Sequence, residues 1–227
     1  MRGDLTMRSS AVSLCQPDSR KSCGACCGLY NYRGGNRQNL ELRLRRRTET
    51  FRSLRPASVE VAKAFANRVR SAEDGRKLLE TIYNCEFLGF VDDDLRRVGC
   101  LLHPEQNQGR DLRSCSFYGA ELCAGHLCLS HQKLTDEEKI CVVGSIDDWY
   151  LYGICVTDID LCKSFFRFAS ERLGGQPGVS VLQRDSVRRA VGAWEYERND
   201  HGIKVHWRFC STDARAKLPR LYPGQSP

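Results

Sequence analysis

Apolar residues recur at helical spacing in the first third of the chain. Four of them share one face of a helix predicted over residues 39–54: Leu40, Leu44, Phe51 and Leu54. Leu42 also allows a strand-like alternation with Leu40 and Leu44. The helix is the preferred interpretation.

Two further helices are predicted to follow. Pro56 suits a first helical turn, and the apolar residues after it repeat with helical period, which predicts a helix over residues 57–70. Ser71 is a suitable cap for another helix, which would run to about Asn84. That helix would bury three apolar side chains: Leu78, Leu79 and Ile82.

The periodicity disappears between Cys85 and Cys128. Glycines and a proline punctuate this stretch, which also holds five cysteines. A loop of this length without elements of its own is unusual unless something else orders it. Metal ligation would provide that order.

Helical patterns return after the cysteine-rich stretch. Thr135 and Glu138 form a capping-box pattern, which opens a helix reaching about Tyr152. Asp158 or Asp160 starts another helix, predicted to run to residue 173.

The C-terminal part predicts a short helix and a hairpin. The helix begins near Asp185. Two strands follow, in which apolar and polar residues alternate on either side of the turn-rich residues 199–202. The apolar positions of these strands are Trp194, Tyr196, Ile203, Val205, Trp207 and Phe209.

Together these elements predict a mainly α fold, with helices around a loop-rich cysteine and metal core and a small C-terminal β-hairpin. Four divisions are expected, and the first is a flexible N-terminal tail over residues 1–21. The others are a cysteine-cluster region over 22–133 with a helical insert at about 39–84, a helical region packed on it over 134–197, and a hairpin strand and tail over 198–227. Neither terminal tail is expected to carry chemistry.

Cysteine content changes this picture most. The chain has 227 residues with ordinary hydrophobic and charged fractions, yet it contains 13 cysteines. Dense cysteine indicates disulfides in an oxidising compartment or thiolate ligation of a metal in a reducing one. The first twenty residues lack the apolar run of a secretory signal, and no later stretch suits a membrane span. We therefore expect a cytoplasmic protein without a membrane partner, and we favour metal ligation.

Eight cysteines are candidate metal ligands. Cys23 and Cys26 have the Cys-x-x-Cys spacing at which two thiolates reach one ion across a tight turn. Because adjacent side chains diverge, Cys27 points toward a second ion, a polynuclear cluster or the core. The full candidate set is Cys23, Cys26, Cys27, Cys85, Cys100, Cys115, Cys123 and Cys128. These thiolates suit either two four-thiolate sites or one polynuclear site.

The other cysteines and the histidines are not favoured as metal ligands. Three cysteines lie among apolar residues of predicted helices and are expected in the core: Cys141, Cys155 and Cys162. Cys15 and Cys210 have no cysteine near them in the sequence and receive no role. His103 and His126 lie in the cysteine-rich loop, where imidazole can replace a thiolate, but a surface or hydrogen-bonding role is preferred.

The cysteine pattern resembles that of a known family. The motifs Cys23-Gly-Ala-Cys26-Cys27-Gly, Cys85-Glu-Phe-Leu and Gly99-Cys100-Leu-Leu-His103-Pro104, with the later Cys115, are similar to the YkgJ-type cysteine-cluster proteins, described as zinc- or iron-chelating. The resemblance covers about residues 23–128 without the helical insert. It implies metal ligation by these cysteines. The chain departs from the family where Arg20 replaces a frequent cysteine, and where residues 111–114 replace a frequent Arg-Pro pair.

Two functions remain open at this point. The first is an iron–sulfur protein with a redox role, which would act with a redox or protein partner. Such a protein would be an iron–sulfur oxidoreductase or a redox component of one. The second is a zinc-stabilised binding module, whose segment Arg33–Arg55 contacts an acidic partner or nucleic acid. That segment holds eight arginines against two glutamates, within a net charge of +7. It has only Phe51 to stack a base, so nucleic acid is not favoured.

Other enzyme classes lack their sequence signals. The motifs of nucleophile-elbow hydrolases, phosphate-binding loops, dinucleotide-binding folds and zinc proteases are absent from the sequence. The acidic run Asp92–Asp94 is interpreted as a solvated turn, because it lacks the regular oxygen spacing of a calcium loop. No catalytic residue or substrate is predicted.

Overall fold

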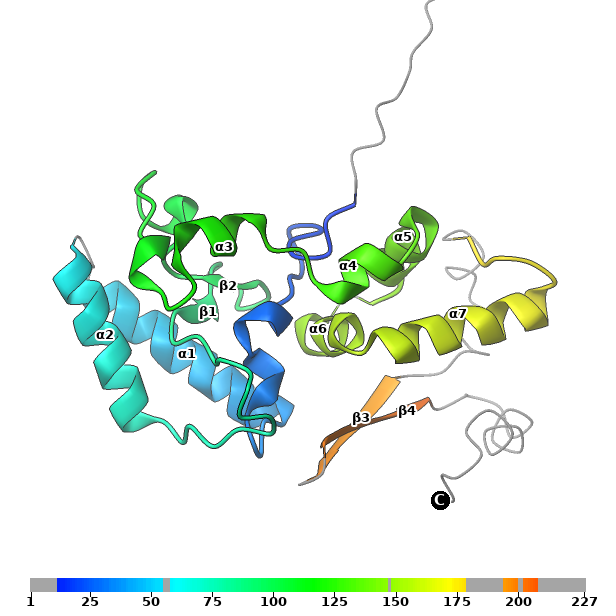
Figure 1. The fold of residues 1–227 in the computed structure, drawn as a ribbon, viewed down its shortest axis with the longest axis horizontal. Coiled ribbons are helices and arrows are strands. Elements are labelled where there is room, and N and C mark those ends of the chain that lie inside the picture. Colours follow the sequence, from blue (N-terminus) through cyan, green and yellow to red (C-terminus); the bar gives the residue numbers. More distant parts are fainter. Residues whose placement is uncertain (1–11, 55–57, 147, 179–193, 200–201, 208–227) are drawn as a thin grey trace, which may run out of the picture.

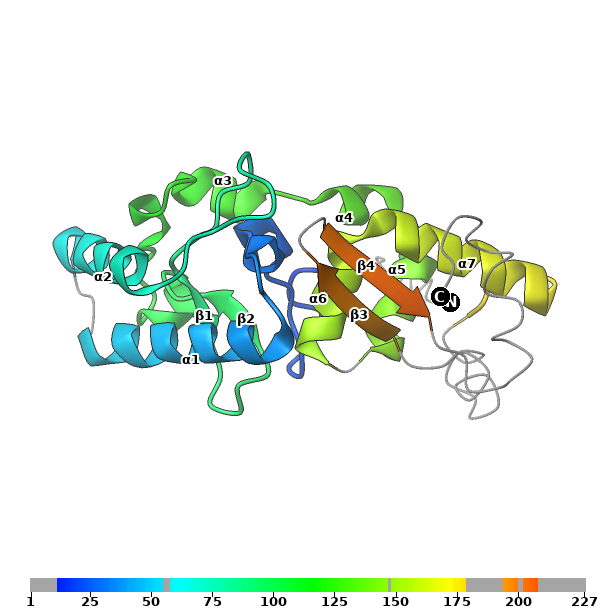
Figure 2. The ribbon, with the colours of Figure 1, turned by 90° about the horizontal axis from the view of Figure 1, so that it is seen from below.

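The structure is a computed structural model that describes residues 12–54, 58–146, 148–178, 194–199 and 202–207. Its helices lie in two lobes, with the first cysteine cluster between them (Figure 1, Figure 2). The first lobe contains α1 (Arg37–Leu54), α2 (Val59–Ala72), β1 (Leu88–Phe90), β2 (Val98–Cys100) and α3 (Gly119–Gly125). The second lobe contains α4 (Leu129–Lys133), α5 (Asp136–Ser145), α6 (Trp149–Thr157) and α7 (Ile159–Leu173). The predicted mainly α class is confirmed.

Short elements fill the connections. Four 3-10 turns are η1 (Ala25–Cys27), η2 (Leu29–Asn31), η3 (Pro104–Gln106) and η4 (Arg113–Cys115). Strands β1 and β2 pair antiparallel, with Leu88 opposite Cys100. The predicted C-terminal hairpin is present as β3 (Trp194–Asn199) paired antiparallel with β4 (Gly202–Trp207). The short helix expected near Asp185 lies outside the described residues, as does Cys210.

The first two predicted helices are confirmed. Helix α1 begins two residues before the predicted start and ends where expected, with Leu40 and Leu44 fully buried. Ser58 caps α2, since its side chain accepts a hydrogen bond from the backbone N–H of Val61.

The helix predicted from Ser71 to about Asn84 is wrong. Helix α2 ends at Ala72, and the chain then turns away, so that Leu79 is 58% exposed. The Asn31 side chain accepts from the Leu79 N–H and donates to the carbonyls of Leu79 and Ile82. These are backbone groups that a helix would satisfy internally, so the distant Asn31 replaces the helical bonds.

The helix predicted from Thr135 to Tyr152 is divided into two. The capping box of Thr135 and Glu138 opens α5 as expected, but α5 ends at Ser145. Asp148 then caps α6 by accepting from the Leu151 N–H, at 2.8 Å. A new cap inside the predicted segment therefore starts a second helix.

Three groups of buried side chains form the core. The first lobe is centred on aromatic residues of α1, α2 and the loop before β1, including Phe51, Phe65 and Phe87. A second group joins the lobes, because Trp149 and Ile154 of α6 pack with the residues around η2, α1 and the β1–β2 hairpin. The third group fills the second lobe and contains three fully buried cysteines, as predicted: Cys141, Cys155 and Cys162.

The described part of the predicted N-terminal tail is packed against the second lobe. Leu14 is fully buried, and its carbonyl accepts a 2.9 Å hydrogen bond from the Tyr152 hydroxyl. Lys21 is also buried and pairs with Asp18 at 2.9 Å. One apolar side chain and one satisfied carbonyl therefore hold this part of the predicted tail against α6. None of the described helices is both long and apolar enough to cross a membrane.

Phe65→Ala should destabilise the first lobe strongly. Phe65 is fully buried, with its ring centroid 5.2 Å from that of Phe51 and 5.6 Å from that of Phe87. Truncation removes both contacts and leaves a cavity, so we expect a loss of about 3–5 kcal/mol in the free energy of unfolding, measured by urea denaturation. Lys63→Ala on the exposed face of the same helix is the control, and equal losses in both variants would contradict this packing.

Candidate metal centre

The tight turn η1 decides where the first three cysteines point. The backbone N–H of Cys27 donates to the Gly24 carbonyl, and the N–H of Gly28 donates to the Ala25 carbonyl. Gly28 has a φ of 75°, and a Cβ added there would lie 2.4 Å from the Tyr83 carbonyl oxygen. No other residue fits this position, because both its backbone conformation and its surroundings exclude a side chain.

The first thiol group contains four cysteines from three separate segments: Cys15, Cys23, Cys26 and Cys128. The backbone N–H of Cys23 donates to the Cys15 carbonyl at 2.9 Å, which holds the N-terminal segment against the turn. Cys23 and Cys128 both pack against the core of the second lobe. Burial, with smaller contributions from the neighbouring thiols of Cys15 and Cys128, raises the pKa of the Cys23 thiol to about 12.

Cys26 and Cys128 have the strongest mutual effect on pKa in this group. Their side-chain interaction raises the pKa of Cys26 above its ordinary value and lowers the pKa of Cys128 to about 5. Backbone hydrogen bonds from Ser130 and His131, near the start of α4, also lower the pKa of Cys128. The pair therefore gives up its first proton readily and its second with difficulty.

The second thiol group contains four other cysteines, from η1, the loop before β1, the end of β2 and α3: Cys27, Cys85, Cys100 and Cys123. Burial is the main cause that raises the pKa of Cys27 well above its ordinary value; the thiols of the other three also raise it, as does Cys23 of the first group. Burial likewise raises the pKa of Cys85 to about 12 and that of Cys100 to about 11. The exposed Cys123 is within hydrogen-bond distance of the Ser116 hydroxyl, at 3.4 Å.

Backbone N–H groups point at sulfur atoms in both groups. The Ala25 N–H donates to the Cys23 sulfur at 3.4 Å. Backbone hydrogen bonding from Phe87 lowers the pKa of Cys85, and that from Leu102 and His103 lowers the pKa of Cys100. Such donors stabilise an anionic sulfur, which is the form that binds a metal.

One predicted ligand, Cys115, and the two histidines of the cysteine-rich loop are not among the members of either thiol group. Cys115, at the end of η4, packs against the same hydrophobic core as Cys27 and Cys100. The His103 ring caps η3, because its Nδ1 accepts from the Glu105 N–H at 3.3 Å. His126 follows α3 and is exposed, which agrees with the surface role preferred for it.

Sequence reasoning missed Cys15. Its partners are distant in the sequence or separated by a polar segment, and its only signal is that it precedes the Cys23 cluster. In the part of the chain that the structure describes, no three side chains of His, Cys, Asp or Glu are arranged to hold a metal ion. The two groups are therefore neighbouring thiols, and metal binding by them stays a prediction.

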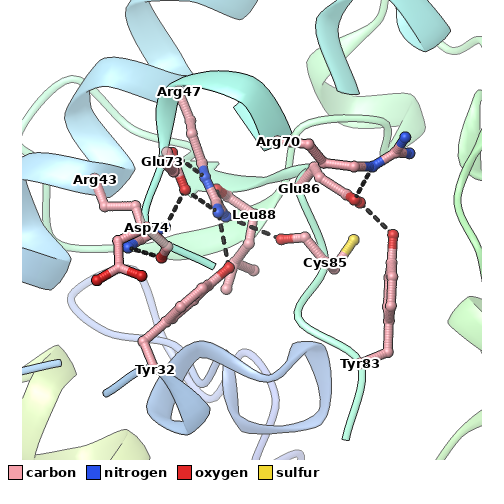
Figure 3. A network of polar contacts seen from close by, with 10 residues as sticks. All are labelled: Tyr32, Arg43, Arg47, Arg70, Glu73, Asp74, Tyr83, Cys85, Glu86 and Leu88. Carbon is pink, nitrogen blue, oxygen red and sulfur yellow. Dashed lines mark hydrogen bonds and ion pairs between the residues drawn. The ribbon is translucent and has the colours of Figure 1, made fainter. Parts of the chain in front are cut away.

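A buried arginine holds the loop that carries Cys85 (Figure 3). Arg47 of α1 is 2% exposed and donates from Nη1 to the carbonyl of Cys85 at 2.9 Å and to that of Leu88 at 3.4 Å. Its other nitrogens donate to Glu73 at 2.6 and 2.8 Å and to the Tyr32 hydroxyl at 2.8 Å. Burial alone would lower the pKa of Arg47, but Glu73 and Tyr32 raise it above its ordinary value. The charge is therefore kept, and it fixes this loop to α1.

Neighbouring ion pairs extend this network (Figure 3). Arg43 pairs with Glu73 and also donates to the Asp74 carbonyl at 2.8 Å. On the other side of Cys85, Glu86 is 5% exposed and accepts from Arg70 at 2.5 Å and from the Tyr83 hydroxyl. Burial and the Glu86 carboxylate raise the pKa of Tyr83 above its ordinary value.

The arginine-rich segment is largely occupied by contacts within the chain. Arg37 pairs with Asp148 across the lobes, and Arg52 pairs with Asp93 at 3.1 Å. Arg45 pairs with Glu41 one helical turn away, and Arg33 donates to the Lys77 carbonyl at 3.0 Å. Together with those of Arg43 and Arg47, these contacts show that most arginines of the segment stabilise the fold.

Comparison with known proteins gives no relative. No protein-family model matches the chain, and neither a curated protein nor a solved structure matches it significantly. The function of the candidate site is therefore inferred from its own residues and geometry alone.

Arg47→Ala should weaken the fold much more than Arg45→Ala. Removing Arg47 leaves the Glu73 carboxylate and two carbonyls of the Cys85 loop without their buried partner, so we expect a loss of about 3–5 kcal/mol in the free energy of unfolding. Arg45 belongs to a half-exposed pair on the same helix, and its loss should cost about 0.5 kcal/mol or less. Thermal and urea denaturation measure both, and similar losses would refute the role given to Arg47.

Proposed function

We propose that this protein binds metal through clustered cysteine thiolates, at two centres of four thiolates each, and that these centres are iron–sulfur clusters with a redox role. The observation that carries the proposal is the gathering of eight thiols into two groups, which adjoin at Cys23 and Cys27. Cys26 belongs to the first group and Cys27 to the second, although they are neighbours in the chain. Buried cysteines that only pack in a core have no need to lie beside other cysteines. Two groups of four thiols from distant segments therefore favour a metal-binding role.

The surroundings of the thiols support the proposal. Four thiolates match the usual ligand set of a tetrahedral ion or of an iron–sulfur cluster. The backbone N–H groups at Cys23, Cys85 and Cys100 stabilise negative sulfur, and the apolar cores beside them exclude water. An iron–sulfur cluster bound there would supply one-electron chemistry, while the chain would set its potential through these hydrogen bonds and its burial.

The zinc-stabilised binding module is the weaker alternative. Four-thiolate ligation suits zinc equally well, so the metal itself does not separate the two functions. The alternative also needs the arginine-rich segment free for an acidic partner or nucleic acid. Its arginines at 33, 37, 43, 45, 47 and 52 contact groups of this chain, which argues against that use.

Protein purified without air should contain two metal centres and show the visible absorption of iron–sulfur clusters. The measurements are iron, zinc and acid-labile sulfide per chain, together with the absorption spectrum. A colourless protein with two zinc ions would keep the two centres and replace the redox role by a structural one. Protein that carries no metal and keeps its fold in a chelator would overturn the proposal.

Single serine substitutions should remove the centres one at a time. Cys15→Ser should cost the first centre and Cys27→Ser the second, so each variant should retain about half of the metal measured in the unmodified chain, because a centre with three thiolates binds weakly. Cys141→Ser is the control, since this thiol lies in the core of the second lobe and its sulfur is 3.1 Å from the Pro177 carbonyl. Full metal content in Cys15→Ser would exclude Cys15 from the ligand set.

A further inference from the structure

A cavity lies at the joint between the two lobes. Its volume is about 400 Å³, and the described residues that line it are Arg20, Leu95, Arg96, Asp148 and Trp149. They come from the N-terminal segment, the β1–β2 hairpin and the start of α6. None of them belongs to either thiol group. Cavities of this size are typical of sites for small molecules.

The carboxylate in the cavity wall is already in use. Asp148 caps α6 by accepting from the Leu151 N–H at 2.8 Å. It also accepts two hydrogen bonds from Arg37, each of 2.5 Å. Its negative charge is therefore balanced by Arg37. Among the described lining residues, the remaining charges are the two guanidinium groups of Arg20 and Arg96.

The turn between β1 and β2 positions Arg96. The Asp92 carboxylate accepts from the backbone N–H of Arg96 at 3.1 Å and from that of Arg97 at 3.0 Å. Leu95 has a φ of 56°, a left-handed conformation that is strained for a side-chain-bearing residue and is often found at ligand sites. Arg97 donates to Gln16 at 3.0 Å, whereas the Arg96 side chain makes no hydrogen bond or ion pair with a described residue. The turn therefore presents the Arg96 guanidinium at the cavity.

Arg20 supplies the second cation of the wall. Its guanidinium pairs with Asp18 at 3.8 Å, but Lys21 holds the same carboxylate more closely, at 2.9 Å. The Arg20 side chain is 56% exposed. A guanidinium has five N–H donors, so Arg20 can contact a ligand and keep this pair.

We propose that this cavity binds a small organic phosphate. A guanidinium donates two parallel N–H bonds to a phosphate group, and a phosphate monoester carries nearly two negative charges near pH 7, which suits two arginines better than a single carboxylate does. The phosphate lies against Arg96 and Arg20, and the organic part of the ligand lies against Leu95 and Trp149. This site does not depend on metal binding by the thiols.

The test is calorimetric titration of the full chain with phenyl phosphate at constant ionic strength. We expect saturable binding at one site per chain, with a change in tryptophan fluorescence that Trp149→Phe removes. Benzoate has the same ring and one negative charge, so it should bind at least about tenfold more weakly. Absence of saturable binding would overturn the site, and equal binding of benzoate would overturn the preference for phosphate.

Substitutions in the wall locate the phosphate. Arg96→Gln and Arg20→Gln should each weaken binding of phenyl phosphate about tenfold, because each removes charge-assisted hydrogen bonds. Both side chains are exposed, so urea denaturation should show unchanged stability. Arg68→Gln, at an exposed position of α2, is the matched control and should bind as the unmodified chain does. Equal weakening in Arg68→Gln would indicate a general charge effect and overturn the proposal.

Discussion

The arrangement of the site depends on the divergence of two adjacent side chains in a tight turn. In η1 the thiols of Cys26 and Cys27 cannot face the same point, and the left-handed Gly28 fixes the direction of the chain after them. The directions of these two thiols determine which other segments each of them meets. One thiol meets the N-terminal segment and the start of α4, and the other meets the loops around the β1–β2 hairpin.

This division matches the construction of the molecule from two lobes. Cys23 and Cys128 rest on the core of the second lobe, whereas Cys27, Cys85 and Cys100 belong to the core of the first. The first thiol group therefore connects segments across the lobe boundary, while the second lies within one lobe. Metal bound by the first group would add to the joint that Trp149 and Ile154 already form.

Arg47 has a structural role that the net charge of the arginine-rich segment does not reveal. A run of arginines on one helix is typical of a solvated face or a basic binding surface. Here one of them is buried with Glu73 and fixes the backbone of a candidate ligand, Cys85. Its charge therefore contributes to the position of a sulfur atom.

The local patterns were sufficient for helices whose signals are short-range. Apolar spacing predicted α1 and α2, and the Thr135 capping box predicted the start of α5, because these features act within a few residues. The same reasoning failed after Ala72, where the Asn31 side chain takes over backbone groups of a segment far along the chain. It also failed at Asp148, whose cap is reinforced by Arg37 from the other lobe.

The sequence by itself determined which residues are chemically able to bind metal and that Cys26 and Cys27 must point apart, since thiol chemistry and backbone geometry are local properties. Only the tertiary structure decided how the thiols are grouped. It brought Cys15 beside Cys23 and Cys128, and it placed Cys115 against the first-lobe core without a thiol partner of its own among the described contacts. Spacing along a chain does not encode these neighbours, because they are set by the packing of lobes that are far apart in sequence.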